Sequence, residues 1–410
     1  MITRTGSVIV VTMALALAAC RSDAGPASTT STTAATSTPS GTETTAPVES
    51  TVASPASAEP TEQPAAFPIA AFAAIREDPV SAAVAAKFQA ILTDMAGGGG
   101  MAATVMTPDG TWSGVTGKAD GVRDIVVDDQ FAIASNTKSV VAAQVMLMVE
   151  AGEIALDDLA TDHLPADLDF DTNGATIRQL LGQRSGLPSY DPSLYKPWLQ
   201  ESPSTDRRRI WTPAETLALV STYRAPAGDD FYYSDVNYLL LGLVIEQVRG
   251  RPVAEVLRDG VLSIDGLERL IYQPDEAPTE PMAMPFGEST AHLEEGGGYL
   301  PSLAAATSNG AAAAMASDSP SLARWWRAFC AGEIVSQTSL TEMTTFQDGY
   351  GLGLFSLYAG AVGHGGEHIG YVTWAGCLPE EGSVVVALSN RAFENVLEMG
   401  IPLVEAVRSD

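Results

Sequence analysis

A serine and a lysine three positions apart are the residues of this sequence best suited to chemistry: Ser135-Asn136-Thr137-Lys138. On a helix, residues i and i+3 share a face, so the Lys138 amine can reach the Ser135 hydroxyl. A free serine is a weak nucleophile, and a neutral lysine is a competent base for it. Apolar neighbours such as Phe131 would favour that neutral form by desolvation. The spacing predicts nucleophilic acyl transfer at Ser135.

The same spacing occurs a second time at 193–196, but in a different context. Pro192 and Pro197 flank that copy, which indicates a loop without fixed geometry. The first copy follows a strand-like run at 131–134 and opens a helix predicted over about 135–151, with apolar residues at helical spacing. A helix N-terminus would also direct backbone N–H groups toward developing negative charge. The context favours Ser135 over Ser193.

The elements around this motif predict an α/β (α+β) unit with a helical region inserted into it. Near the start, a helix is expected from Asp78-Pro79 to about residue 95, followed by a strand, a turn and a second strand at 102–106, 108–110 and 111–117. Residues 175–345 are expected to be mainly helical. Further strands are predicted at 350–358, 371–376 and 383–388, and a last helix at 391–407.

The first twenty residues indicate export. Arg4 precedes an apolar run at 8–18 that is short for a membrane span, and the run ends in Leu-Ala-Ala-Cys20. That ending resembles the bacterial lipobox, in which the signal is cut before the cysteine and the thiol carries lipid. We therefore expect a signal peptide at 1–19 and a lipid anchor on Cys20, which places the protein on the extracytoplasmic side of the cell membrane. An ordinary signal peptide or an uncleaved apolar start are the alternatives.

Residues 20–66 are rich in Ser, Thr, Ala and Pro and are expected to form a flexible tether, with the folded domain at 67–410. The formal net charge is −28, from 50 acidic and 22 basic residues. Such a surface repels phosphate backbones, so nucleic acid is not an expected partner.

The cysteines and histidines give little support for a metal site. No Cys-x-x-Cys pair or Cys/His cluster occurs, and glycines around His364 and His368 argue against a helix that would bring those two together. We therefore expect neither metal nor cofactor. Cys330 and Cys377 could form a disulfide after export or remain free and buried. The pair Trp325-Trp326 is expected in the core or in the wall of a pocket.

Four stretches in order resemble the β-lactamase-related serine hydrolases, a family that includes class C β-lactamases, D-alanyl-D-alanine carboxypeptidases, D-aminopeptidases and esterases. They lie in the part of the chain from about 75 to 408, and they are FAIASNTKS at 131–139, LLGQRSGLP at 180–188, FYYSDVNYLLLG at 231–242 and VGHGGEHIGY at 362–371. The resemblance implies a β-lactamase/transpeptidase-like fold, with a mainly antiparallel sheet flanked by helices. It also implies catalysis through an acyl-enzyme on Ser135, with Lys138 as a base.

The same resemblance assigns roles to residues of the later motifs. Tyr233 would share the proton transfers with Lys138, with its pKa lowered by a nearby lysine ammonium. His364 would give electrostatic support and hydrogen bonding. Gly366 would let substrate backbone approach, and the N–H groups of Ser135 and Glu367 would form the oxyanion hole.

Departures from the family pattern bear on the substrate. Asp235 stands where many members have asparagine, Glu367 where the carboxypeptidases often have threonine or serine, and Gln183 where histidine is usual. Carboxylates at Asp235 and Glu367 would repel a substrate that carries a carboxylate. Alternatively, Glu367 points to solvent and Asp235 simply pairs with Lys138.

The sequence thus predicts a serine hydrolase acting on an ester or an amide, such as a D-amino-acid amide or peptide. A D-alanyl-D-alanine carboxypeptidase or β-lactamase is the alternative within the family. A surface binding or sensor module that acylates slowly is an alternative from another class. The expected partners are a small-molecule or peptide substrate and the membrane, while the sequence does not indicate the oligomeric state.

Overall fold

The computed structural model describes residues 65–189, 207–222, 224–228, 230–285, 297–391, 393 and 395–409. These residues belong to one compact unit. The predicted signal peptide at 1–19, Cys20, the predicted tether up to residue 64 and the second Ser-x-x-Lys copy at 193–196 lie outside the described residues.

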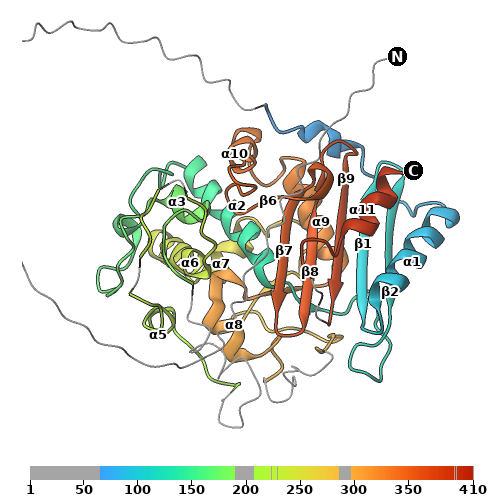
Figure 1. Ribbon diagram of the computed structural model, residues 1–410, viewed down its shortest axis with the longest axis horizontal. Helices are drawn as coiled ribbons and strands as arrows, with labels where there is room; N and C mark the ends of the chain where they lie inside the picture. The colour runs from blue at the N-terminus through green and yellow to red at the C-terminus, as the bar shows by residue number, and fades with distance from the viewer. Residues whose placement is uncertain are drawn as a thin grey trace, which may run out of the picture. The chain divides into compact units, whose positions relative to one another are not determined.

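A six-stranded antiparallel sheet forms one side of this unit (Figure 1). Its strand order is β2-β1-β9-β8-β7-β6, so the first and last parts of the chain pair in its centre. The strands are β1 (Met101–Thr107), β2 (Gly110–Thr116), β6 (Phe355–Ser356), β7 (Val362–His368), β8 (Tyr371–Leu378) and β9 (Ser383–Ser389). β1, β8 and β9 are buried along almost their whole length, because helices cover both faces of the sheet.

Helices α1 (Ala82–Ala96) and α11 (Ile401–Arg408) pack on one face of the sheet, and α9 (Ser319–Cys330) packs on the other. Alternating residues of β1 and β9 divide between the two resulting cores. Ala103 and Val385 pack with Phe88 and Leu403 of α1 and α11. Their neighbours along the strands join the larger core that contains α9.

The larger core continues into the helical region, drawn to the left of the sheet in Figure 1. Its helices are α2 (Thr137–Glu150), α3 (Ile177–Leu181), α5 (Pro213–Leu217), α6 (Asp235–Arg249), α7 (Val253–Asp259), α8 (Leu303–Asn309) and α10 (Gln337–Met343). Three short strands from distant segments form a second, antiparallel sheet. Its order is β3 (Phe131–Ala132), β5 (Met315–Ser317) and β4 (Ile271–Tyr272). Nearly every residue of α2 is buried, so this helix is enclosed by the other elements.

The predicted fold class is confirmed, with differences at several element ends. The first helix begins at Ala82 with Ser81 as its N-cap, because Pro79 is paired in a bridge with Thr111. The predicted strand at 350–358 shortens to β6, and the predicted last helix at 391–407 shortens to α11. Trp325 and Trp326 are fully buried, as expected.

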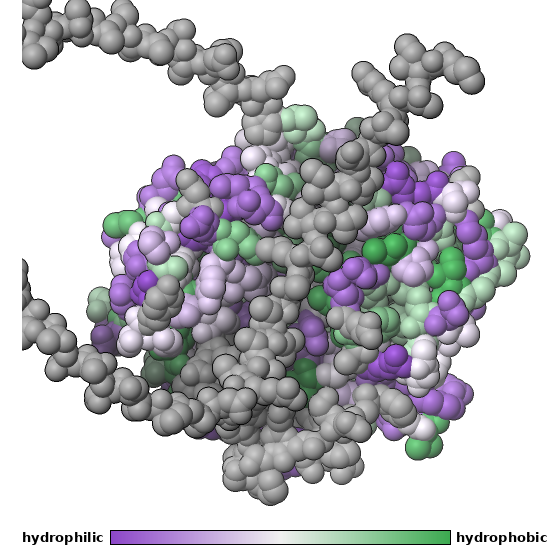
Figure 2. Space-filling view, viewed as in Figure 1, coloured by the Kyte–Doolittle hydropathy of each residue, from purple (hydrophilic) through white to green (hydrophobic). Residues whose placement is uncertain are grey.

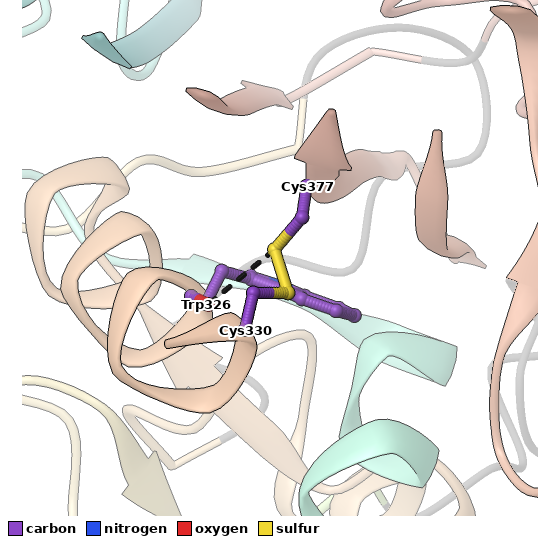
Figure 3. Close-up of a disulfide and its surroundings, with 3 residues drawn as sticks. All are labelled: Trp326, Cys330 and Cys377. Carbon is purple, nitrogen blue, oxygen red and sulfur yellow. Dashed lines mark hydrogen bonds between the residues drawn. A yellow bond between two sulfur atoms is a disulfide. The ribbon is translucent and has the colours of Figure 1, made fainter. Parts of the chain in front are cut away.

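Cys330 at the end of α9 and Cys377 in β8 form a disulfide (Figure 3). The two residues are 47 positions apart and both are fully buried. The sulfur of Cys377 also lies 3.4 Å from the backbone oxygen of Trp326. The bridge therefore fastens the helix to the sheet face that it covers.

Replacing both bridge cysteines with alanine is expected to lower the free energy of unfolding by about 2–4 kcal/mol. The reason is that the bridge restricts the unfolded chain across the segment that it closes. Denaturant unfolding of the wild-type and double-alanine proteins measures the difference. Equal midpoints for the two proteins would contradict the expectation.

On the face shown in Figure 2, hydrophilic residues are visible over both the sheet side and the helical side, with hydrophobic residues scattered among them. Among the described residues, no helix combines the length and apolar character needed to cross a bilayer.

Candidate active site

Ser135 lies in a single 3-10 turn, Ala134–Asn136, immediately before α2. The predicted helix over 135–151 is therefore shifted, since its regular part begins at Thr137. The residue before the serine, Ala134, has a φ of 49°, a left-handed conformation that costs a non-glycine residue about 1 kcal/mol. The turn leaves Ser135 half-buried while the residues on either side of it are buried.

Side-chain hydrogen bonds hold this strained turn in place. The Thr137 hydroxyl donates to the Ala134 carbonyl at 2.7 Å and accepts from the Met315 N–H at 3.1 Å. The Asn136 amide donates to the His364 carbonyl at 3.0 Å. The nucleophile is thus fixed between β5 and β7, and its position does not depend on α2 alone.

Lys138 is completely buried, and its amine makes three hydrogen bonds. It donates to Ser135 Oγ at 3.0 Å, to Asp235 Oδ1 at 2.6 Å and to the Ala312 carbonyl at 3.0 Å. The predicted reach from Lys138 to Ser135 is therefore present in the structure. The ion pair with Asp235 corresponds to the second of the two alternatives for that carboxylate.

Tyr233 lies beside the same two side chains. Its hydroxyl hydrogen bonds with Ser135, and the Lys138 amine lies over its ring, 5.0 Å from the centroid. Burial and the Asp235 carboxylate raise the pKa of Tyr233 well above its usual value. The expected lowering of this pKa is wrong, because burial and then the carboxylate at 235 oppose the phenolate.

His364 is fully buried on β7 and hydrogen bonds through both ring nitrogens. Nδ1 contacts the Gly365 carbonyl, and Nε2 lies 3.3 Å from the Tyr350 hydroxyl. Burial, with a smaller contribution from Lys138, lowers the pKa of His364 to about 3. At neutral pH the imidazole is uncharged, which fits a hydrogen-bonding role better than the expected electrostatic support.

Gly366 brings β7 directly against the turn that carries the nucleophile. A Cβ on Gly366 would lie 2.4 Å from the Ile133 carbonyl oxygen and 3.1 Å from the Ser135 nitrogen. Side chains alternate along a strand, and a Cβ on Gly365 would point toward Val396 and Leu397. The exposed side chain of Glu367 belongs to that same face and points away from Ser135. Repulsion of substrate by the Glu367 carboxylate is therefore not supported.

Asp235 is the first residue of α6, and its side chain retains 26% exposure. Gln183, in place of the usual histidine, helps to position this helix start. Its side-chain oxygen accepts hydrogen bonds from the Ser234 N–H at 2.9 Å and from the Asn237 amide. The Gln183 backbone oxygen accepts from the Tyr232 N–H at 2.8 Å.

A comparison with protein families now identifies the relationship. The profile of the family described as Beta-lactamase matches residues 84–406, which is most of the chain. The chain belongs to the beta-lactamase family. The predicted family resemblance is confirmed, and with it the assignment as a serine hydrolase of this fold.

Similar structures of this beta-lactamase-family protein include two amide hydrolases. The D-stereospecific amidohydrolase from Streptomyces sp. has a TM-score of 0.65 and 27% identity, covering 75% of this chain and 94% of that one. The D-amino acid amidase from Ochrobactrum anthropi SV3 has a TM-score of 0.68 and 24% identity, covering 80% and 99%. At that identity the second likeness shows the fold alone.

Curated relatives match over shorter stretches. Protein flp of Staphylococcus aureus (strain MW2) is 29% identical over 134 residues, 32% of this chain and 25% of its own length. Penicillin-binding protein 4* of Bacillus subtilis (strain 168) is 26% identical over 162 residues, 38% of this chain and 34% of its own length. The matches thus span about a quarter to a third of those relatives.

Other residues of this beta-lactamase-family site were missed by the sequence analysis. His368 lies on the same face of β7 as His364, is buried, and has Nε2 3.5 Å from the Asn309 amide. Burial lowers its pKa to about 4. Tyr350 packs edge-on against Tyr233. The alternation of β7 could have indicated His368. Tyr350 begins the segment 350–354, which together with 362–371 resembles the third family motif, but the resemblance assigns this tyrosine no role.

The described part of the chain offers no cluster of three or more histidine, cysteine or acidic side chains suited to a metal ion. In the ion pair between Lys138 and Asp235, the two opposite charges offset each other. His364 and His368 are uncharged at neutral pH. The assembled site therefore presents little net charge to a substrate.

The two buried histidines are expected to destabilise the folded state as the pH falls from 7 to 5. An imidazole in the unfolded chain titrates near 6.5, whereas the folded values are about 3 for His364 and 4 for His368. As the pH falls, the histidines therefore bind protons in the unfolded state before they do in the folded state. This lowers the free energy of unfolding by roughly 2 kcal/mol for each histidine across this range.

Denaturant unfolding of wild type and His368→Gln at pH 7 and pH 5 measures this cost. The variant should lose less stability on acidification than the wild-type protein. An identical loss in the two proteins would show that His368 does not contribute.

Proposed function

We propose that this enzyme hydrolyses an ester or an amide through an acyl-enzyme on Ser135, and that its substrate carries no carboxylate near the scissile bond. The observation that carries this proposal is the ion pair between Lys138 and Asp235 beside Ser135. In the first step, the Ser135 oxygen attacks the acyl carbon and the amine or alcohol departs. Water then releases the acid and regenerates the serine.

The substrate class follows from the charge of the site. A substrate carboxylate needs a cation or several free donors, yet all three N–H groups of a Lys138 ammonium already have acceptors. Asp235 keeps part of its carboxylate exposed, which disfavours an anion and favours a neutral or amine-bearing substrate. Two of the similar structures are a D-stereospecific amidohydrolase and a D-amino acid amidase, which supports an amide of a D-amino acid as the first choice.

The experiment is a substrate panel tested with the full-length protein. It contains D-phenylalanine amide, its L-enantiomer, a p-nitrophenyl ester, a peptide ending in D-Ala-D-Ala and a chromogenic cephalosporin. We expect kcat/KM for the carboxylate-free substrates to exceed that for the other two by at least about tenfold. Equal or faster turnover of the D-Ala-D-Ala peptide or the cephalosporin would contradict the proposal and favour the carboxypeptidase or β-lactamase alternative. Stable acylation without turnover would favour the binding-module alternative.

We also propose that the enzyme is exported and anchored to the membrane by lipid on Cys20. The apolar leader and its Leu-Ala-Ala-Cys ending support this, and the Cys330–Cys377 disulfide fits an oxidising compartment. Metabolic labelling with a radioactive fatty acid in a bacterial host tests the anchor. Label in the wild-type protein and none in Cys20→Ala is the expected result. Equal labelling of both, or of neither, would contradict the anchor.

A further inference from the structure

Lys138 has the hydrogen-bond pattern of an ammonium, which raises the question of where the Ser135 proton goes. Its three N–H groups point to Ser135 Oγ, Asp235 Oδ1 and the Ala312 carbonyl. An ammonium has no lone pair, so in this state it cannot accept a proton from the serine. Some other group must first take a proton from Lys138 or directly from Ser135.

Tyr233 and His364 are poor candidates for that group. The pKa of Tyr233 is raised by burial and by Asp235, so its phenolate is disfavoured. The Lys138 amine lies over the Tyr233 ring, where it supports the phenolate oxygen less than a direct hydrogen bond would. Both ring nitrogens of His364 are already engaged, by Gly365 and Tyr350.

Asp235 is placed to take the proton. Its Oδ1 lies 2.6 Å from Lys138 Nζ, the shortest of the three contacts of that amine. We propose that Asp235 is the proton acceptor of Lys138 during acylation, an inference that rests on the proposed hydrolase function. An asparagine, which the family pattern leads one to expect at 235, has no oxygen basic enough for this transfer.

The transfer balances in protons and charge. One N–H bond of Lys138 breaks as an O–H bond forms on Asp235, the Ser135 proton moves to the vacated position on Lys138, and the serine oxygen bonds to the acyl carbon. The cluster starts with a lysine ammonium and an aspartate anion. It ends with the ammonium, a neutral Asp235 and an oxyanion on the substrate, so the negative charge moves from Asp235 to the reacting carbonyl. Lys138 is an ammonium again once it holds the serine proton, and in that form it stabilises the negative charge that develops beside Ser135.

Collapse of the tetrahedral species reverses these transfers. The leaving amine or alcohol takes a proton from Lys138, and Lys138 recovers one from Asp235. Asp235 is the first residue of α6, where the helix N-terminus favours the carboxylate and so favours this return. The ion pair is thereby restored for hydrolysis of the acyl-enzyme.

The other titratable groups around the pair do not provide a substitute. They come from α6, from the segment before it, from β7 and from the segment before β6. Five of them have a ring beside Lys138 or an electrostatic interaction with Lys138 or Asp235. They are Tyr233, Tyr238, Tyr350, His364 and His368. The tyrosines have pKa values raised by burial and the histidines have values lowered by it. Asp235 remains the described carboxylate that is paired directly with the Lys138 amine, at 2.6 Å.

The test measures the pH dependence of Ser135 phosphonylation by a fluorophosphonate, so it needs no knowledge of the natural substrate. In that reaction the serine oxygen bonds to phosphorus, fluoride leaves, and the serine proton passes to the same base. Full-length wild type, Asp235→Asn and Asp230→Asn are compared between pH 5 and pH 10. Asp230→Asn is the matched control, because it removes one exposed carboxylate five residues away. Thermal unfolding verifies that each variant is folded.

We expect the wild-type protein and Asp230→Asn to react well into the acid range. Asp235→Asn should react about 100-fold more slowly at pH 6, and its half-maximal rate should lie about 2 pH units higher. A uniformly slower rate with an unchanged pH midpoint would overturn the inference, because Asp235 would then only position Lys138. Absence of labelling in wild type would instead overturn the proposed function, and this inference with it.

Discussion

Replacing Lys138 with methionine is expected to lower kcat/KM by about 10³-fold or more for any ester or amide that the wild-type enzyme turns over. Methionine has a similar length but removes all three hydrogen bonds from Nζ, including the one to Ser135. The variant also leaves Asp235 without its cation in a site where 26% of its side chain is exposed. Stopped-assay kinetics with the best substrate of the panel measures the effect.

The matched control for this prediction is Lys118→Met. Lys118 pairs with Asp124 at the surface, where both side chains are largely exposed, so its loss should leave kcat/KM within about twofold. Thermal unfolding of both variants separates lost chemistry from lost structure. A folded Lys138→Met protein that keeps more than about a tenth of wild-type activity would exclude Lys138 from the proton transfers.

The second large effect is expected from Gly366→Ala. The new Cβ would lie 2.4 Å from the Ile133 carbonyl oxygen, a contact that no real Cβ tolerates, and the opposing atom belongs to the backbone of the nucleophile turn. The turn must therefore move, and a displacement of about 1 Å at a reacting atom costs on the order of 100-fold in rate. We expect kcat to fall by about that factor, with a stability loss of about 1–3 kcal/mol.

Gly365→Ala is the neighbouring control for that experiment. Its Cβ would meet the far end of the Leu397 side chain at 2.8 Å, and a flexible side chain can shift. This variant adds the same methyl group to the same strand but on the face opposite Ser135. Similar losses of kcat in both variants would mean that the close approach of Gly366 to Ser135 is unimportant for the reaction.

Much of the fold could be predicted from the sequence because its signals are local. The turn at 108–110 lies between two strand-like runs, and it produces the β1–β2 hairpin. The four family motifs give the order of the site elements along the chain. The ends of elements were less predictable, since β6 contains only two of the nine residues of the strand predicted at 350–358. Before β6, the backbone N–H groups of Leu352 and Gly353 donate instead to the carbonyls of Met343 and Leu181, which lie far away in the sequence.

The sequence identifies which residues form the site, but it does not establish which of them contact one another. Ser135 and Lys138 share a turn, so their contact follows from spacing alone. The pairing of Lys138 with Asp235 joins positions 97 residues apart, and sequence left it as one of two alternatives. The raised pKa of Tyr233 could not be predicted either, because it depends on how deeply the ring is buried and on how near the Asp235 carboxylate lies, and spacing gives neither quantity. For Glu367, too, the sequence leaves two alternatives, and its exposed side chain on the other face of β7 agrees with the one in which it points to solvent.

The central claim is that Ser135 is an activated nucleophile, and intact-mass spectrometry after exposure to a fluorophosphonate tests it most directly. The full-length wild-type protein, Ser135→Ala and Ser193→Ala would be treated side by side at neutral pH, with thermal unfolding as the check on folding. We predict one adduct on the wild-type protein and on Ser193→Ala, and none on Ser135→Ala. A folded wild-type protein without an adduct, or an adduct that persists in Ser135→Ala, would contradict the assignment of the nucleophile.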